Sequence, residues 1–222
     1  MARKSETPTS EILQSYGRFR FLRLEEPKAF EEGQKPRWEA TQILDPSDPK
    51  GKEGIKLHLA TAARLVKEAY GVTPLAIKKL AAKFLGAPKV DLNDPANADD
   101  GIKVAFIDGD AEKYKDYAGY AGMLVIPCHN TKLRPDVAGR NGKRVVPGDP
   151  QYPYDGCYGY LSSTLWCQKG LTEQKYGKRL GINLRGVQFA KDGQRYTQDE
   201  INDEFQALGD EAPAADDMSA FD

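Results

Sequence analysis

The 222-residue sequence predicts a mainly β fold, an antiparallel barrel or sandwich with a pair of helices packed at one end. Many short segments have strand composition, and turns rich in Gly, Pro and Asp separate them. The repeated strand and helix alternation of a parallel sheet is absent from the sequence. We expect one folded domain over residues 16–198, a flexible N-terminus (1–15) and a disordered acidic tail (199–222).

The expected elements follow from residue composition and apolar spacing. Aromatic and other β-compatible residues predict strands at 16–24 and 37–45, followed by a loop at 45–54. Apolar residues then recur at spacings of three and four, which predicts helices at 57–70 and 74–86 and hence a helical insertion at about 55–86. Strand character returns in five further segments: 102–110, 120–127, 144–147, 156–168 and 179–196.

The composition excludes several classes of protein. No apolar run approaches the ~20 residues of a transmembrane helix, and the first residues lack the apolar core of a signal peptide, so we expect a cytoplasmic protein. Cys128, Cys157 and Cys167 are odd in number and lack C-x-x-C spacing, which argues against a disulfide framework. With His129 they form a zinc-ligand set by composition alone, whereas buried free thiols are the simpler expectation.

The charges are divided unevenly along the chain. Nine of the 33 acidic residues follow residue 198 and all 32 Lys and Arg residues precede it, so the body carries +8 and the tail −9. A basic body with an acidic appendage is typical of a nucleic-acid binder whose tail competes with the ligand. The alternative is a tail that only increases solubility.

The segment 156–168 separates two kinds of side chain by strand parity. Cys157, Gly159, Leu161, Ser163, Leu165 and Cys167 share one face, which is small and apolar enough for a barrel interior. The opposite face carries three large rings, Tyr158, Tyr160 and Trp166. Nucleobases could stack on these rings, and each stacked base would contribute about 1–3 kcal/mol to binding. Alternatively, helices of the same chain or a second subunit would cover the rings.

Basic residues lie near these rings in the sequence. The Gly-containing loop 129–146 carries Lys132, Arg134, Arg140, Lys143 and Arg144. Tyr117 and Tyr120 precede it, and Arg18 and Arg20 alternate with aromatic residues in the first expected strand. Basic residues interleaved with aromatics indicate a stacking platform beside a groove for phosphates.

Signatures of enzymes are weak in this sequence. It contains no G-x-x-x-x-G-K-[ST] or G-x-S-x-G motif, and His58, at a helix start, and His129, in a loop, have no evident Ser or Cys partner to activate. Asp108 and Asp110 match the carboxylates of a Mg²⁺-dependent nuclease. The intervening Gly makes a simple turn the preferred interpretation.

Four motifs together resemble bacteriophage single-stranded DNA-binding proteins. These are KVAFIDGD (103–110), LRPD (133–136), YDGCYGYLSSTLWC (154–167) and GINLRGVQFAKDGQRY (181–196), and the resemblance covers about residues 10–198. It implies an OB fold, a five-stranded barrel whose open face takes the DNA strand. It also implies that an acidic tail ending in an aromatic recruits polymerase, helicase or primase, although Phe221 is the penultimate residue here.

The predicted function is sequence-independent coating of single-stranded DNA during phage replication, recombination and repair, in the host cytoplasm, with no catalysis, metal or cofactor. The alternatives are a metal-dependent nuclease and a protein-interaction module. The rings and tail are also compatible with a homodimer. We expect Gly156 and Gly181 to be structural. The predicted stacking residues are Tyr117, Tyr120, Tyr158, Tyr160 and Trp166, the phosphate-binding residues Lys132, Arg134, Arg140 and Lys143, and the partner-binding tail residues Asp216, Asp217, Phe221 and Asp222.

Overall fold

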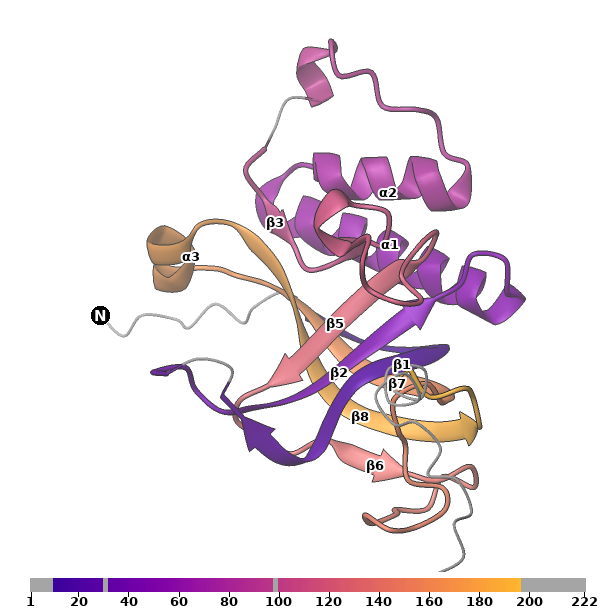
Figure 1. The fold of residues 1–222 in the computed structure, drawn as a ribbon. Helices are drawn as coiled ribbons and strands as arrows, with labels where there is room; N and C mark the ends of the chain where they lie inside the picture. The colour runs from indigo at the N-terminus through magenta and orange to yellow at the C-terminus, as the bar shows by residue number, and fades with distance from the viewer. Residues whose placement is uncertain (1–9, 30–31, 98–99, 197–222) are drawn as a thin grey trace, which may run out of the picture.

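The computed structural model describes residues 10–29, 32–97 and 100–196, and its main body is a single β-sheet with helices at one end (Figure 1). The strands are β1 (Ser10–Lys28), β2 (Arg37–Leu44), β3 (Lys103–Val104), β4 (Ile107–Asp108), β5 (Leu124–Asn130), β6 (Asp136–Ala138), β7 (Tyr158–Cys167) and β8 (Arg179–Lys191). The α-helices are α1 (Pro49–Tyr70), α2 (Leu75–Leu85) and α3 (Leu171–Tyr176), and the 3₁₀ turns are η1 (Pro95–Asn97) and η2 (Glu112–Tyr114).

Five of these strands form a closed barrel. The sheet runs in the order β8-β7-β1-β2-β5, and a pairing of β5 with β8 at His129 and Asn183 joins the two edges. The β1–β2, β1–β7, β7–β8 and β2–β5 pairs are antiparallel. The prediction of a mainly β barrel of the OB type with an inserted helical pair is therefore confirmed.

Helix α1 closes one end of the barrel, with α2 packed beside it (Figure 1). The Asp48 carboxylate accepts a hydrogen bond from the Gly51 amide at 2.9 Å, and Pro49 occupies the first turn, where its missing N–H costs nothing. The helix ends at Gly71, whose φ of 81° is left-handed. A Cβ at Gly54 would lie 3.2 Å from Ser15, so this glycine lets α1 approach β1 closely.

A buried polar group lies between α1 and the barrel. The Ser15 hydroxyl donates to Gln42 Oε1 at 2.6 Å and lies 2.9 Å from His58 Nε2. His58 is fully buried, and desolvation lowers its pKa to about 4. The imidazole is therefore neutral at physiological pH, and it carries no acid–base role at the surface.

Several boundaries differ from those expected from the sequence. Strand β1 starts at Ser10 instead of residue 16, because the polar segment 10–15 pairs with β7 along its whole length. Helix α1 begins at Pro49, inside the expected loop, because Asp48 caps it there. Residues 1–9 of the expected flexible N-terminus and the tail 199–222 lie outside the described residues.

The region 102–147 also differs from expectation. The expected strand 102–110 is broken into the short strands β3 and β4, and the strand expected at 120–127 begins only at Leu124 and continues to Asn130. Segment 144–147 is not a strand and forms an isolated bridge between Ala138 and Arg144. Strand β6 and helix α3 were not expected, since each is short and surrounded by turn residues.

The three cysteines are buried free thiols, as expected. Burial raises the pKa of Cys157 and of Cys167 to about 11. Over residues 10–29, 32–97 and 100–196, no group of three or more His, Cys, Asp or Glu side chains is placed to hold a metal ion. In the same part of the chain, no helix has the length and apolar content needed to cross a bilayer.

Candidate nucleic-acid interface

Strand β7 has the parity expected from its sequence. Its burial alternates without interruption from Tyr158 to Cys167, with the odd-numbered residues buried and the even-numbered ones partly exposed. Leu161, Ser163 and Leu165 have no exposed surface and face the barrel interior. The rings of Tyr158, Tyr160 and Trp166 therefore lie on the outer face.

Tyr16 of β1 joins two of these rings. Tyr16 pairs directly with Tyr160 across the two strands, and the ring centroids are 5.3 Å apart in an edge-on contact. Its centroid is 6.3 Å from that of Tyr158, with the planes 17° apart. Two lysines lie over these rings, Lys50 Nζ at 4.9 Å from the Tyr16 centroid and Lys191 Nζ at 4.5 Å from that of Tyr158. Aromatic faces and cations are thus placed together on the outer face.

Two arginines extend this group along β1. The guanidinium carbon of Arg18 lies 5.9 Å from the Tyr158 centroid and 4.1 Å from that of Tyr196. That of Arg20 lies 4.6 Å from Tyr196 and 6.0 Å from Tyr117, which is 41% exposed. We call this continuous surface the aromatic strip. It consists of Tyr16, Tyr158, Tyr160, Tyr117 and Tyr196 with Arg18, Arg20, Lys50 and Lys191.

One predicted stacking residue, Tyr120, is placed differently, and Trp166 is packed against a neighbouring strand. Tyr120 is only 3% exposed, and burial raises its pKa to about 12, so its ring packs inside the protein against Tyr117 instead of offering a free face. Trp166 packs against Gly181, where a Cβ would lie 2.5 Å from the indole ring. Gly181 is therefore required for this contact. Gly156 is also structural, since it has a φ of +103° and a Cβ there would lie 2.1 Å from the Gln194 carbonyl oxygen.

The predicted phosphate-binding residues lie beside the β7–β8 face. Lys132, Arg134, Arg140 and Lys143 are all exposed. Strand β6, within this loop, pairs with β8 from Asp136 to Ala138 and so fixes the loop against the barrel. The Arg140 Nε donates to the Ala190 carbonyl at 2.8 Å, which holds the start of the guanidinium group against β8.

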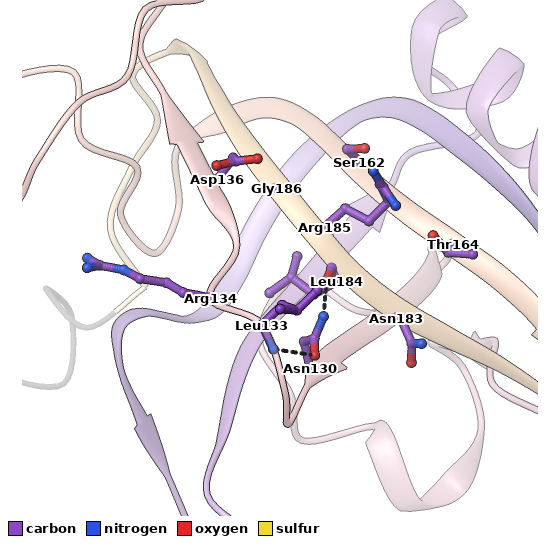
Figure 2. Close-up of a pocket in the computed structure, with 10 residues that line it drawn as sticks. All are labelled: Asn130, Leu133, Arg134, Asp136, Ser162, Thr164, Asn183, Leu184, Arg185 and Gly186. Atoms are coloured by element: carbon purple, nitrogen blue, oxygen red, sulfur yellow. Dashed lines mark hydrogen bonds between the residues drawn. The ribbon is translucent and has the colours of Figure 1, made fainter.

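A polar pocket of about 380 Å³ lies between this loop and the outer face of β7 and β8 (Figure 2). Its lining includes Ser162 and Thr164 of β7, Asn183 and Arg185 of β8, and Arg134. In Figure 2 the Arg185 side chain extends across the face towards Ser162, whereas Arg134 points away from the pocket. Asn130 donates to the Leu184 carbonyl at 2.9 Å and accepts from the Leu133 amide, which fixes the loop entry. The pocket adjoins the ring-bearing part of β7 and offers hydroxyl, amide and guanidinium groups.

Asp108 and Asp110 do not form an open metal site. Both carboxylates pair with Lys83, with Lys83 Nζ at 2.7 Å from Asp110 Oδ2. The lysine holds the pKa of the Asp110 carboxyl below its usual value. The Asp110 amide donates to Asp108 Oδ1 at 3.0 Å, and the Gly122 amide donates to Asp110 Oδ1 at 2.7 Å. These contacts are those of a turn anchored to α2.

The residues that the sequence missed are Tyr16, Tyr196, Lys50 and Lys191. Strand register places Tyr16 opposite Tyr160 and Lys191 opposite Tyr158. Lys50 reaches the Tyr16 ring from α1, and Tyr196 reaches Arg18 from beyond β8. Tyr16 and Tyr196 were visible as aromatics at the ends of basic stretches, but the register of the strands was not.

Comparisons with known proteins agree with this architecture. The family model described as "Enterobacter phage Enc34, ssDNA-binding protein" matches residues 10–218. Putative protein p50 of Acyrthosiphon pisum secondary endosymbiont phage 1 is 39% identical over 90 residues, which cover 40% of this chain and 44% of that protein. The matched region thus spans less than half the length of this curated relative.

Two solved structures of the single-stranded DNA-binding protein from bacteriophage Enc34 show the same fold. The complex with ssDNA has a TM-score of 0.56 at 21% identity, covering 87% of this chain and 96% of that chain. The C-terminal truncation has a TM-score of 0.57 at 22% identity, covering 88% and 99%. With the family model matching most of its length, the chain belongs to the Enterobacter phage Enc34 single-stranded DNA-binding protein family.

Proposed function

We propose that this protein binds single-stranded DNA without sequence preference and coats it during phage replication, recombination and repair in the host cytoplasm. The observation that carries the proposal is the aromatic strip, in which rings on the outer face of β1 and β7 alternate with Arg18, Arg20 and Lys191. Aromatic faces stack on any base, and cations beside them bind any phosphate, so such a surface needs no particular sequence. Membership of the Enc34 family supports the same conclusion.

In this proposal the outer face of β7 and its neighbours binds the bases, and the basic loop binds the phosphates. Bases stack on Tyr158, Tyr160 and Tyr117, and Trp166 adds an apolar edge at the far end of β7. The backbone follows Lys132, Arg134, Arg140 and Lys143 along the neighbouring loop. No step requires a metal or cofactor, because the free energy comes from stacking and from the release of counterions.

The acidic tail supplies regulation in this proposal. Residues 199–222 carry nine acids and no cations, so they compete with DNA for the basic face and become available to replication proteins when DNA displaces them. Asp216, Asp217, Phe221 and Asp222 are the residues proposed to contact such a partner. A homodimer is also compatible with this arrangement.

The proposal is tested by filter binding of oligo-dT at several salt concentrations. Wild-type protein should bind with an affinity that falls steeply with salt, and Tyr158→Ala with Tyr160→Ala should weaken binding by at least about tenfold. Tyr176→Ala is the matched control, since Tyr176 is 56% exposed on α3 and lies outside the strip. Unchanged affinity in a folded double variant would remove the stacking role.

Two other functions give different results in simple assays. A metal-dependent nuclease using Asp108 and Asp110 would degrade single-stranded DNA during incubation with Mg²⁺, whereas a binding protein leaves it intact. Because Lys83 already pairs with both carboxylates, we expect the DNA to remain intact. A protein-interaction module would show no salt-dependent retention of DNA.

A further inference from the structure

Tyr196, the last residue that the structure describes, lies on both arginines of the aromatic strip. Its centroid is 4.1 Å from the Arg18 guanidinium carbon and 4.6 Å from that of Arg20. Of the aromatic rings around Arg18 and around Arg20, that of Tyr196 is the nearest to each guanidinium carbon. The Tyr196 hydroxyl is buried and has no hydrogen-bond partner among the described residues. The ring is therefore held by its aromatic face, and its polar end is left unsatisfied.

The backbone before Tyr196 lies close to neighbouring segments, and these contacts place the ring. A Cβ at Gly193 would lie 2.1 Å from the Gly156 carbonyl oxygen, and one at Gly119 would lie 2.6 Å from the Tyr196 hydroxyl oxygen. Two backbone carbonyls also fix the Arg18 guanidinium, that of Gly156 at 3.1 Å and that of Gln194 at 2.5 Å. The site for the ring is thus built into the turn between β8 and the tail.

A flat ring on a guanidinium group is the contact that a nucleobase makes with arginine. A cavity of about 280 Å³ lies beside Tyr196 and is also lined by Tyr16, Tyr158 and Lys191. Asp45 and Asp48 line it as well, but the Asp48 carboxylate caps α1 and that of Asp45 accepts from Ser47. The cavity therefore continues the row of rings towards the arginines.

We propose that Arg18 and Arg20 form a nucleobase-stacking subsite that the protein's own Tyr196 fills when DNA is absent. A base that enters the subsite displaces the ring and gains the same guanidinium contacts, while its phosphate adds a charge that the phenol lacks. Residues 197–222 follow Tyr196 directly in the sequence, so displacement of the ring releases the anchor point of the segment that carries the acidic tail. The inference rests on the proposed binding of single-stranded DNA and adds a switch to it.

The test is the affinity of the full-length Tyr196→Ala variant for fluorescent oligo-dT, measured by anisotropy at fixed salt. Removing the internal competitor should tighten binding by about 5- to 30-fold, the equivalent of two cation–aromatic contacts. Tyr196→Phe keeps the aromatic face and removes the unsatisfied hydroxyl, so it should bind no more tightly than the wild type. Tyr176→Ala serves as the remote control and should also match.

The outcomes separate this inference from the proposed function. If the wild type fails to bind oligo-dT, the proposed function is wrong. If the wild type binds and folded Tyr196→Ala binds equally or more weakly, Tyr196 is not a competitor and the inference is overturned. Should Tyr196→Ala unfold, Tyr196→Leu keeps apolar volume without the aromatic face, and the same tightening is expected of it.

Discussion

Protonation of His58 should lower the free energy of unfolding of this protein at acidic pH. The imidazole is fully buried between α1 and the barrel, its Nε2 lies 2.9 Å from the Ser15 hydroxyl, and its Nδ1 has no partner among the described residues. Since the Ser15 hydroxyl donates to Gln42 at 2.6 Å, Nε2 carries the proton of the neutral ring and Nδ1 is the atom that acid would protonate. That charge would have no counterion in the buried site.

The magnitude follows from the two pKa values of His58. Burial lowers the pKa to about 4 in the folded protein, against 6.5 for an exposed histidine. The unfolded chain therefore takes up a proton first as the pH falls, and the stability present above about pH 6.5 is lost towards pH 4. Linkage gives a loss of about 2 kcal/mol between pH 7.5 and pH 5, and about 3 kcal/mol at pH 4.

Urea denaturation of wild type and His58→Gln at pH 7.5 and pH 5 measures this contribution. Carboxylates titrate in both proteins, so the difference between the two pH-dependent losses isolates His58. Wild type should lose about 2 kcal/mol more than His58→Gln over this interval, whatever the variant's stability at pH 7.5. Equal losses in the two proteins would mean that the imidazole is not held neutral by burial.

Three further predictions concern the irregular part of β1 between Arg20 and Arg23, the basic loop and the tail. Asp155→Ala should lower the free energy of unfolding by about 1–3 kcal/mol in urea melts, because its carboxylate accepts from the amides of Phe21 and Leu22 at 3.0 and 2.7 Å; Asp116→Ala, at an exposed position, should leave it unchanged. Replacing Lys132, Arg134, Arg140 and Lys143 by Ala should reduce the salt slope of oligo-dT binding by up to about 3, and an unchanged slope would place the phosphates elsewhere. Deleting residues 199–222 should tighten DNA binding at low salt and have no effect at high salt, whereas equal or weaker binding at low salt would contradict competition by the tail.

The sequence was sufficient to predict the fold class, because the alternation of side chains along a strand and the spacing of apolar residues along a helix are local properties. The alternation of Cys157, Leu161 and Leu165 with Tyr158 and Tyr160 depends only on neighbours in the chain, and the structure reproduces it. The same holds for the helical spacing that predicts α1 and α2. These features need no knowledge of what lies across the sheet.

The candidate site depends on pairings that no local pattern contains. Segment 10–15 was expected to be flexible and is a strand because β7 supplies its hydrogen-bond partners. Tyr16, Tyr158 and Lys191 are far apart in sequence and meet through the register of three strands. Tyr117 and Tyr120 are both tyrosines of one short segment and both precede an alanine, but tertiary packing buries the Tyr120 ring and leaves Tyr117 exposed. Composition therefore locates the interface only approximately.

The bulge in β8 shows how one residue can serve both the core and the interface. Ser163 pairs with Leu184 and Ser162 with Gly186, so Arg185 is an extra residue opposite β7. Before it the even-numbered Leu180, Ile182 and Leu184 are buried, and after it the odd-numbered Val187 and Phe189 are buried. The extra residue shifts the alternation by one position, so that apolar side chains on both sides of the bulge face the core. The Arg185 side chain itself points outward over the pocket of Figure 2.

Substitution of Arg185 should consequently weaken DNA binding without loss of stability, whereas its deletion should lower stability. Arg185→Ala keeps the bulge, so the melting temperature should stay near that of the wild type while DNA affinity and its salt slope fall, the slope by about 0.7. Deleting Arg185 removes the bulge and turns Val187 and Phe189 outward, at a cost of about 3–6 kcal/mol from lost burial. A deletion variant that melts with the wild type would show that the two halves of β8 do not depend on the bulge, because the strand would then have another way to bury both apolar sets.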